Sequence, residues 1–584
     1  MRMLLEALDA DLEAALSAVG VEGEVWRKVI GPARERTEGD VALPCFPFAK
    51  AVGRPPAAIA EDLAAALEGH PALLEARASN GYLNLIADPA WLLQRLLEAD
   101  GSQSQGENRL LLIEHTSANP NGPFHVGRAR NAILGDTLVR LNRLAGRKVR
   151  AEYYVDDMGK QVGVLAWALE HLDEAQVNGL LSDREAADPR WANKADHSRV
   201  RWYQAAQLLR QEASEEEQAR IEDEIGRMVH ASEHGDVAVL EAFEAAYGPV
   251  LEGMLETLGR LGIAFDAFTK ESTFVVDGSV SAVMDELADL PIHGVAENGA
   301  RFLDLGQRGL KGKTEFFYRR ADGSSLYATR DLAYHRWKWT QADHLIDVLG
   351  EDHRLQAKQV GLTLQELGVQ APEVVFYSFI KLPEGKMSTR RGNVVFMDDL
   401  LEEAVAHAAA LVRDLRPEYD EAQVLSIAEA VAISAVRFNI IRVSPEKGFT
   451  FTWEEALSLD GGSAPFAMYA HTRACSIARR LEDAGWSAGE DVSLPEAPAP
   501  GLVSLLRLLA VHPDVLAQAV EQHRPHLFAL HLLDLATAYN GFYRDCPVIV
   551  DGQVHALHAT VSETARAVLH DGLVGVGVVP LDRM

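Results

Sequence analysis

Two short segments of the chain combine residue types that suit phosphate chemistry. In the first, His125, Gly127 and Arg128 precede an amphipathic helix that follows a strand-like run at 110–113. The N–H groups and dipole of a helix N-terminus favour phosphate, Gly127 lets a flat base or ribose approach, and His125 and Arg128 supply donors. With 20 His and 45 Gly in 584 residues, the pattern His-x-Gly is expected about 1.5 times by chance. Taken alone, a helix-capping histidine explains it equally well.

The second segment, at 386–393, is cationic and follows an apolar run at 374–380 and a turn. Its candidate functional residues are Lys386, Met387, Ser388 and Arg390. Such a loop can close on a triphosphate and stabilise the charge that develops as pyrophosphate leaves. A solvated basic turn is the plainer interpretation of this segment by itself. The two segments together favour the functional interpretation over the structural one, because each follows a predicted strand and each belongs to one half of the same predicted sheet.

Two clusters of strand and helix patterns must position these segments. The first comprises 110–113, a helix that ends at Gly146, and 149–155; the second comprises 344–349, 355–367 and 374–380. Strand–helix–strand units build a parallel sheet, so we predict an α/β catalytic core of the Rossmann type. Between the clusters, acid-rich helical sequence at about 165–262 indicates an insertion, and strands are expected at 300–305 and at 316–327, with a turn at 322–323.

Three domains are expected along the chain. Residues 1–100 predict a small α+β unit, with helices at 4–16 and 57–67 and a strand at 81–87, followed by a polar linker. The catalytic core would occupy 108–410. Residues 411–584 predict an α-helical bundle, with helices at 422–443, 465–484, 502–511, 513–521 and 526–543.

The composition is that of a globular protein, with 48% hydrophobic and 24% charged residues and a mean hydropathy of −0.07. Neither a membrane span nor a secretory leader is indicated, and three scattered cysteines suggest a reducing cytoplasm. The net charge of −30 argues against nucleic acid as a partner. A local basic surface can still bind a polyanion, because salt screens distant acids over about 8 Å.

The two segments, which read HVGR and KMSTR here, resemble the HIGH and KMSKS signatures of class I aminoacyl-tRNA synthetases. The resemblance extends to the arginyl-tRNA synthetase family and covers essentially the whole chain. It is carried by EHTSANPNGPFHVGRARNAILGDTLVRLNRLAG, YYVDDMGKQ, SLYATRDLAYH, KMSTRRGN, FAMYAHTRACSI and GVGVVPLDRM. In the first 100 residues, EGDVALPCFPFAKAVGRPP and GYLNLI look like that family's additional tRNA-binding domain. The helical bundle would then be the anticodon-binding domain.

The resemblance also implies roles for single residues. Arginine would be bound by Glu114, Asn119, Tyr327, Asp331 and, where the family has a Gln, His353. ATP would be bound by His125, Gly127, Arg128, Lys386, Met387 and Ser388, and catalysis would use His125, Gly127, Arg128, Lys386, Ser388 and Arg390. Tyr469 would contact the anticodon loop. A guanidinium is planar and always charged, so carboxylates hold it best, which suits Glu114 and Asp331.

Two signature positions depart from the family pattern. Arg128 stands where HIGH has its second His, and Thr389 stands where KMSKS has its second Lys. Relatives that lack this Lys often carry one shortly before HIGH, where this chain has Gly122. Lys386, Arg390 and Arg391 are the cations available to replace it. These departures leave open which groups contact the phosphates.

The reaction implied is activation of L-arginine by ATP with Mg²⁺, then transfer of arginine to the terminal ribose of tRNA(Arg), by a monomer. The resemblance further implies that activation requires bound tRNA. Catalysis would come from positioning and charge stabilisation. Two alternatives stay open: a different class I activity, and a non-catalytic tRNA-binding paralogue suggested by the altered signatures. No cluster with metal-ligand spacing is visible.

Two further groups of residues have both a functional and a structural interpretation. The first helix of the core concentrates basic residues that suit either an acceptor-stem contact or a solvated face: Arg128, Arg130, Arg140, Arg143, Arg147, Lys148 and Arg150. In the bundle, aromatic and basic side chains could stack on bases: Tyr469, His471, Arg473, Tyr539, Phe542, Tyr543 and Arg544. For Phe466, Tyr539 and Phe542 a place in the hydrophobic core is the stronger interpretation.

Overall fold

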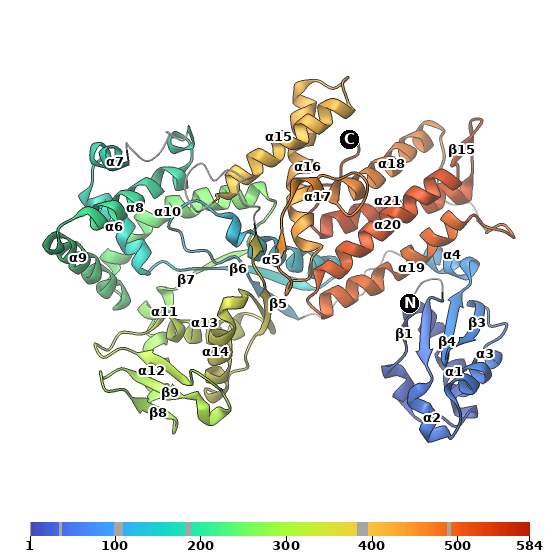
Figure 1. Ribbon diagram of the computed structural model, residues 1–584, viewed down its shortest axis with the longest axis horizontal. Helices are drawn as coiled ribbons and strands as arrows, with labels where there is room; N and C mark the ends of the chain where they lie inside the picture. Colours follow the sequence, from blue (N-terminus) through green and yellow to red (C-terminus); the bar gives the residue numbers. More distant parts are fainter. Residues whose placement is uncertain (1, 34–37, 99–108, 182–188, 382–394, 488–491) are drawn as a thin grey trace.

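A computed structural model describes residues 2–33, 38–98, 109–181, 189–381, 395–487 and 492–584. Figure 1 shows a blue N-terminal unit, a sheet-centred part from cyan to yellow-green, and an array of orange and red helices. The predicted α/β class is confirmed, with a parallel sheet and a helical C-terminal region.

The central sheet is fully parallel in the order β12-β11-β5-β6-β7. Its strands are β5 (Leu110–Glu114), β6 (Lys148–Val155), β7 (Ala267–Lys270), β11 (His344–Gly350) and β12 (Glu373–Tyr377). The chain runs from β5 to one side of the sheet and later returns to the other side through β11. A crevice outside the carboxyl ends of β5 and β11 is the place where such sheets bind ligands.

Three helices connect and cover these strands: α5 (Val126–Leu144), α13 (Tyr327–Gln341) and α14 (Arg354–Glu366). The first of them, α5, packs on the sheet and also contacts helices of the C-terminal region. Most of its surface is therefore buried, including Ile133, Leu134, Leu138 and Leu141.

Burial of α5 decides between the two interpretations of its basic residues. Arg130 is 1% exposed, and its guanidinium donates to the carbonyl oxygens of Ser378, Ser444 and Lys447 at 2.5–2.9 Å. Three other arginines of the stripe, two on α5 and one on β6, form ion pairs: Arg140–Asp136 at 2.7 Å, Arg143–Asp266 at 2.6 Å and Arg150–Glu152 at 2.7 Å. Much of the basic stripe thus joins the helix to its neighbours, and for the buried Arg130 neither an acceptor-stem contact nor a solvated face is correct.

The helical insertion is present where the charge pattern predicts it. It comprises α6 (Lys160–His171), α7 (Glu174–Leu181), α8 (Ala195–Glu212), α9 (Glu215–Glu233) and α10 (Val237–Arg260). After β7 come α11 (Thr273–Val276), α12 (Ser279–Ala288) and an antiparallel sheet of β8 (His293–Val295), β9 (Arg301–Asp304) and β10 (Glu315–Arg319). The predicted turn at 322–323 is confirmed, but the strand expected after it, up to 327, is wrong. A tight turn with Gly323 at φ 92° follows β10, and Tyr327 begins α13.

The N-terminal unit has its own core and an antiparallel sheet in the order β1-β2-β4-β3. Its elements are α1 (Arg2–Ala18), β1 (Gly31–Pro32), β2 (Val41–Pro44), α2 (Phe46–Val52), α3 (Pro56–Ala66), β3 (Leu73–Ser79), β4 (Tyr82–Ala87) and α4 (Pro89–Glu98). Helix α4 packs against a helix of the C-terminal region.

The C-terminal region is helical, as predicted. Its helices are α15 (Met397–Leu415), α16 (Glu421–Ile441), α17 (Trp453–Ala456), α18 (Ala464–Asp483), α19 (Pro500–Glu521), α20 (Pro525–Asp545) and α21 (Ala556–Gly575), and short strand pairs involve β13 (Ile380–Lys381), β14 (Phe449–Thr450), β15 (Ile549–Val550) and β16 (Gln553–Val554). The predicted break between 511 and 513 is wrong, because α19 continues through Pro513. By length and composition α16 and α19 could cross a membrane, but 72% of the apolar window of α16 is buried inside the protein.

Candidate active site

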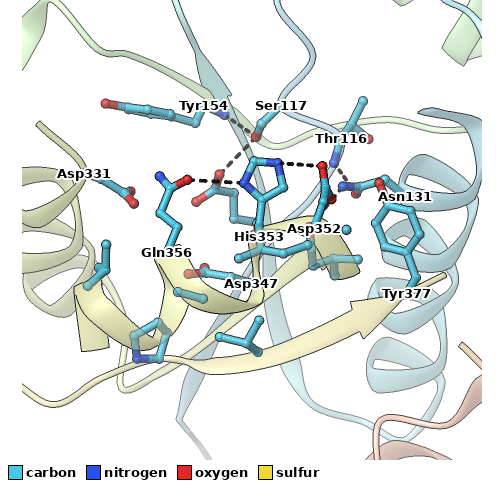
Figure 2. Close-up of a pocket in the computed structure, with 18 of the residues that line it drawn as sticks. Thr116, Ser117, Asn131, Tyr154, Asp331, Asp347, Asp352, His353, Gln356 and Tyr377 are labelled. Carbon is cyan, nitrogen blue, oxygen red and sulfur yellow. Dashed lines mark hydrogen bonds and ion pairs between the residues drawn. The ribbon is translucent and has the colours of Figure 1, made fainter. Parts of the chain in front are cut away.

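A cavity of about 690 Å³ opens at the carboxyl edge of β5 and β11, beside the N-termini of α5 and α13 (Figure 2). It brings together residues that lie as far apart as 114 and 379 in the sequence. Eight of the predicted site residues line it: Glu114, Asn119, His125, Gly127, Arg128, Tyr327, Asp331 and His353. Tyr469 lies elsewhere, on α18.

The segment 125–128 forms the first turn of α5. His125 has an extended backbone at the N-cap position, and the N–H of Val126 donates to the Val395 carbonyl at 3.0 Å. A Cβ on Gly127 would lie 3.0 Å from Nδ1 of His125, so a larger residue would crowd the imidazole. Burial, with a further contribution from Arg128, lowers the pKa of His125 to about 4. The imidazole is therefore neutral at physiological pH.

Lys386, Met387, Ser388, Thr389, Arg390 and Arg391 lie outside the described residues. The chain on either side of that segment is placed near the cavity. Phe396 forms an antiparallel bridge with His125, and the N–H of Met397 donates to the Phe124 carbonyl at 2.7 Å. These contacts join residues 395–397, which follow the second signature segment in the chain, to the first segment.

A sharp turn after β5 presents Glu114 to the cavity. Thr116 and Ser117 have φ angles of 70° and 35°, a left-handed conformation that is unfavourable for residues with a Cβ. Hydrogen bonds hold the turn: Asn131 Oδ1 accepts from the Thr116 N–H at 2.7 Å, and Ser117 Oγ accepts from the Tyr154 N–H at 3.1 Å (Figure 2). The Ser117 hydroxyl also donates to Glu114 Oε1 at 3.1 Å. Strained backbone of this kind, costing about 1–3 kcal/mol per residue, is commonly found at functional sites.

Tyr327 and Asp331 are one turn apart on α13, so both side chains lie on the same helical face at the cavity. Across the cavity, Asn119 Nδ2 donates to Asp156 Oδ2 at 3.0 Å. Asp156 also lines the cavity but was not predicted from the sequence. Its position in YYVDDMGKQ, directly after a predicted strand, is the signal that could have found it.

His353 lies in the turn between β11 and α14. Its side chain is 49% exposed, with Nδ1 3.4 Å from Gln356 Oε1 and Nε2 3.7 Å from Asp352 (Figure 2). Gln356, one helical turn later, also lines the cavity. The structure thus places an amide beside the histidine, close to where the family has Gln. Gln356 was not predicted from the sequence, because it lies three residues after the position that aligns with the family's Gln.

Three further residues in or beneath the cavity, His335, Lys338 and Asp347, were not predicted from the sequence because their side chains are buried. Lys338 pairs with both Glu114 and Asp347, and His335 pairs with Asp347 at 2.7 Å. His335 is 5% exposed inside α13 and pairs with the carboxylates of Asp331 and Asp347.

Two groups of potential metal ligands are brought together in the described part of the chain, although the sequence shows no ligand spacing. They are Asp196, His197 and Asp398, and His471, Cys475 and Asp582. In the first group, Lys194 Nζ already lies 2.9 Å from Asp196 and 2.7 Å from Asp398. An ammonium therefore occupies the position that a cation would take, and this group joins α8 to the start of α15.

The aromatic residues of the bundle separate into core and surface. Tyr539 and Phe542 are 0% exposed, as the core interpretation predicts, and Phe466 is partly buried. Tyr469 and Tyr543 are exposed on α18 and α20. The Arg473 guanidinium lies between them, 4.4 Å from the Tyr469 ring centroid and 5.2 Å from that of Tyr543. The result is an exposed platform of two rings and a guanidinium.

Three family models match the chain. They are described as tRNA synthetases class I (R), catalytic domain, over residues 92–453, arginyl tRNA synthetase N terminal domain over 6–87, and DALR anticodon binding domain over 467–584. Together with the parallel sheet and the cavity at its carboxyl edge, the first match places the chain among the class I tRNA synthetases.

Comparison with individual proteins narrows this class. Arginine–tRNA ligases of Methanocella arvoryzae and Methanothermobacter thermautotrophicus are each 38% identical to the chain, over 92% and 97% of both sequences respectively. The arginyl-tRNA synthetase structure of Thermus thermophilus matches with a TM-score of 0.80 at 26% identity, covering 99% of this chain and 100% of that one. The chain belongs to the arginyl-tRNA synthetase family, which confirms the predicted resemblance.

Proposed function

We propose that the cavity binds L-arginine beside ATP and that the chain works as an arginine–tRNA ligase. The observation that carries this proposal is the convergence of two carboxylates, Glu114 from β5 and Asp331 from α13, in one cavity at the N-terminus of α5. Two acids from different elements suit a planar guanidinium, which can receive a carboxylate on more than one edge.

The residues that line the cavity fall into two groups, one for each end of the amino acid. Glu114, Asp331 and the Tyr327 hydroxyl take the guanidinium. Asn119 orients the α-amino and carboxylate end, where Asp156, its hydrogen-bond partner, is placed to receive the α-ammonium. His353, beside Gln356, would contact the substrate from the opposite wall of the cavity. The ammonium of lysine carries its three N–H donors on a single nitrogen and cannot span these acceptors as a planar guanidinium does. Some of them would stay unpaired, so discrimination against lysine needs no editing step.

ATP would lie against the first turn of α5. Its phosphates would meet His125 and Arg128, and its base or ribose would pass over Gly127. From the second signature segment, Lys386, Met387 and Ser388 would bind ATP, and Lys386, Ser388 and Arg390 would stabilise the leaving pyrophosphate. Mg²⁺ would enter with the nucleotide and neutralise charge on its phosphates.

The reaction then has two steps. An oxygen of the arginine carboxylate attacks the α-phosphorus of ATP, and the bond from that phosphorus to the oxygen that bridges to the β-phosphorus breaks. Pyrophosphate is released and arginyl-adenylate is formed. A hydroxyl of the terminal tRNA ribose then attacks the arginyl carbonyl carbon, and AMP leaves. No covalent enzyme intermediate is required, so the side chains act by positioning and by stabilising charge.

We further propose that each of the three parts of the chain contacts a different region of the tRNA. Residues 1–100 would contact tRNA outside the active site, 108–410 would hold its acceptor end, and 411–584 would bind the anticodon loop. Three free, buried cysteines favour a reducing compartment such as the cytoplasm. We propose that the chain works there as a monomer.

Replacing Tyr469 by Ala is expected to weaken tRNA binding about 5- to 100-fold, because stacking of one base on an aromatic ring contributes about 1–3 kcal/mol. The measurement is the dissociation constant of tRNA(Arg) at one fixed salt concentration. Tyr419→Ala, in the same region but away from the Tyr469–Arg473–Tyr543 platform, is the matched control. Equal affinity of the Tyr469 variant and the unaltered chain would exclude this platform as an RNA contact.

The test of the whole proposal is aminoacylation of unfractionated tRNA with each amino acid in turn, together with ATP–pyrophosphate exchange with and without tRNA. We expect arginine alone to be attached, and exchange only when tRNA is present. Tight tRNA binding without attachment of any amino acid would instead favour the non-catalytic paralogue, since Arg128 and Thr389 depart from the signatures.

A further inference from the structure

A row of alternating charges lies under the part of the cavity proposed to hold the guanidinium. Lys338 Nζ is 2.8 Å from Glu114 Oε2 and 2.7 Å from Asp347 Oδ1. The other oxygen of Asp347 is 2.7 Å from His335 Nε2, and His335 Nδ1 is 3.2 Å from Asp331 Oδ1. The order is carboxylate, ammonium, carboxylate, imidazole, carboxylate. Its two ends, Glu114 and Asp331, are the two acids assigned to the substrate.

The pairing of the strands β5 and β11 explains why cations are needed in this row. Glu114 and Asp347 are direct partners in the register of the parallel strands β5 and β11. Like charges on neighbouring strands repel, and here both are largely buried, with side chains 13% and 6% exposed. Lys338, whose side chain is 0% exposed, places its ammonium between them. Residues 331, 335 and 338 share one face of α13, so the helix delivers both cations to the same edge of the sheet.

The electrostatic environment agrees with this arrangement. Burial raises the pKa of Glu114, and Lys338 opposes that shift. Burial and Lys338 disfavour a charge on His335, yet Asp331 and Asp347 raise its pKa to about 10, so it is an imidazolium at neutral pH. Burial alone would raise the pKa of Asp347, but Lys338 and His335 outweigh it and lower that pKa.

We propose that Lys338 is a positioning and specificity-determining residue: it keeps Glu114 ionised and aimed at the substrate, and with His335 it sets the charge of the guanidinium pocket. Three carboxylates and two cations leave a net charge of −1, which one guanidinium neutralises. Lys338 itself does not line the cavity, so it acts through Glu114. The inference rests on the proposed arginine site.

Comparing two ligands of the same shape, arginine and citrulline, distinguishes a loss of charge in the pocket from a loss of its shape. The ureido group of citrulline is the neutral counterpart of the guanidinium. In Lys338→Met the buried Glu114 has lost its counter-ion and is expected to take up a proton. The KM for arginine should rise about 10- to 100-fold, as expected for coupled neighbours. The inhibition constant of citrulline, the KM for ATP and kcat should stay within about threefold. Lys358→Met, an exposed lysine on α14, is the matched control.

A double-mutant cycle with Glu114→Gln shows whether Lys338 acts through Glu114. On the Glu114→Gln background, Lys338→Met should change the KM for arginine less than about threefold. Equal weakening of arginine and citrulline, or additive effects in the cycle, would mean that Lys338 only supports the packing, and would overturn the inference. If Glu114→Gln alone left the KM for arginine unchanged, the proposed arginine site itself would be wrong. Should Lys338→Met fail to fold, Lys338→Gln, which keeps an amide donor for Glu114, takes its place with the same expected results.

Discussion

Replacing Asp331 by Asn is expected to lower kcat/KM for arginine about 100-fold or more. The substitution preserves size and removes one negative charge from the proposed guanidinium site. Truncating one partner of a partly buried charge pair costs about 2–5 kcal/mol, which corresponds to a factor of about 30 to several thousand. The side chain of Asp331 is only 24% exposed, so water compensates little of this loss. The measurement is steady-state aminoacylation at varied arginine concentration.

The control for this variant is Asp289→Asn, which changes an exposed carboxylate at the end of α12, outside the cavity. Asp331→Glu keeps the charge and is expected to retain more activity than Asp331→Asn. Because Asp331 also contacts His335, thermal unfolding of each variant shows whether the fold is preserved. Full activity of the Asn variant would place arginine elsewhere and would favour a different class I activity for this cavity.

Replacing His125 by Ala is expected to lower the rate of ATP–pyrophosphate exchange, measured in the presence of tRNA, about 100- to 1000-fold. This is the usual effect of removing one donor that stabilises developing charge. His125→Gln keeps an N–H donor and should retain a larger share of the rate. His230→Ala, at an exposed position on α9, is the matched control. An unchanged rate in His125→Ala would exclude a role for this side chain in adenylate formation.

The pH dependence identifies the form of His125 that acts. Its pKa is lowered to about 4 by burial and by Arg128. From pH 6 to 9 the cationic fraction is then at most about 1%, so the neutral imidazole must be the donor. The ratio of the unaltered rate to the His125→Gln rate is therefore expected to stay constant across this range. A ratio that falls steadily from pH 6 to 8 would mean that an imidazolium is required.

Much of the architecture could be predicted because it depends on local pattern. Apolar runs of strand length, a glycine at the end of a helix, and acid-rich helical sequence indicate their elements without knowledge of the fold. The errors arose where two conformations were locally possible. Tyr327 lies in a run with strand character but begins α13, and Pro513 is accommodated inside α19, because tertiary packing outweighs local preference at both places.

The residues of the candidate site also divide into those that local sequence patterns identify and those that only tertiary packing identifies. Glu114, His125, Gly127, Arg128 and Asp331 could be identified because they follow predicted strands or begin helices in motifs with a recognisable resemblance. The buried positions of Arg130 and Lys338 could not be identified in this way. A basic residue on an amphipathic helix is ordinarily exposed, and only the packing of α5 and α13 against other elements shows these two to be buried.

The sequence by itself determined the family, the order of the elements and many of the residues that line the cavity, since local patterns and motifs indicate these. Only the tertiary structure decided which charges neutralise one another. Glu114, Lys338 and Asp347 are separated by up to 233 residues, yet β5, α13 and β11 bring the Lys338 ammonium within 3 Å of both carboxylates. Electrostatic interactions depend on distance and burial in space, and neither quantity can be read from separation along the chain.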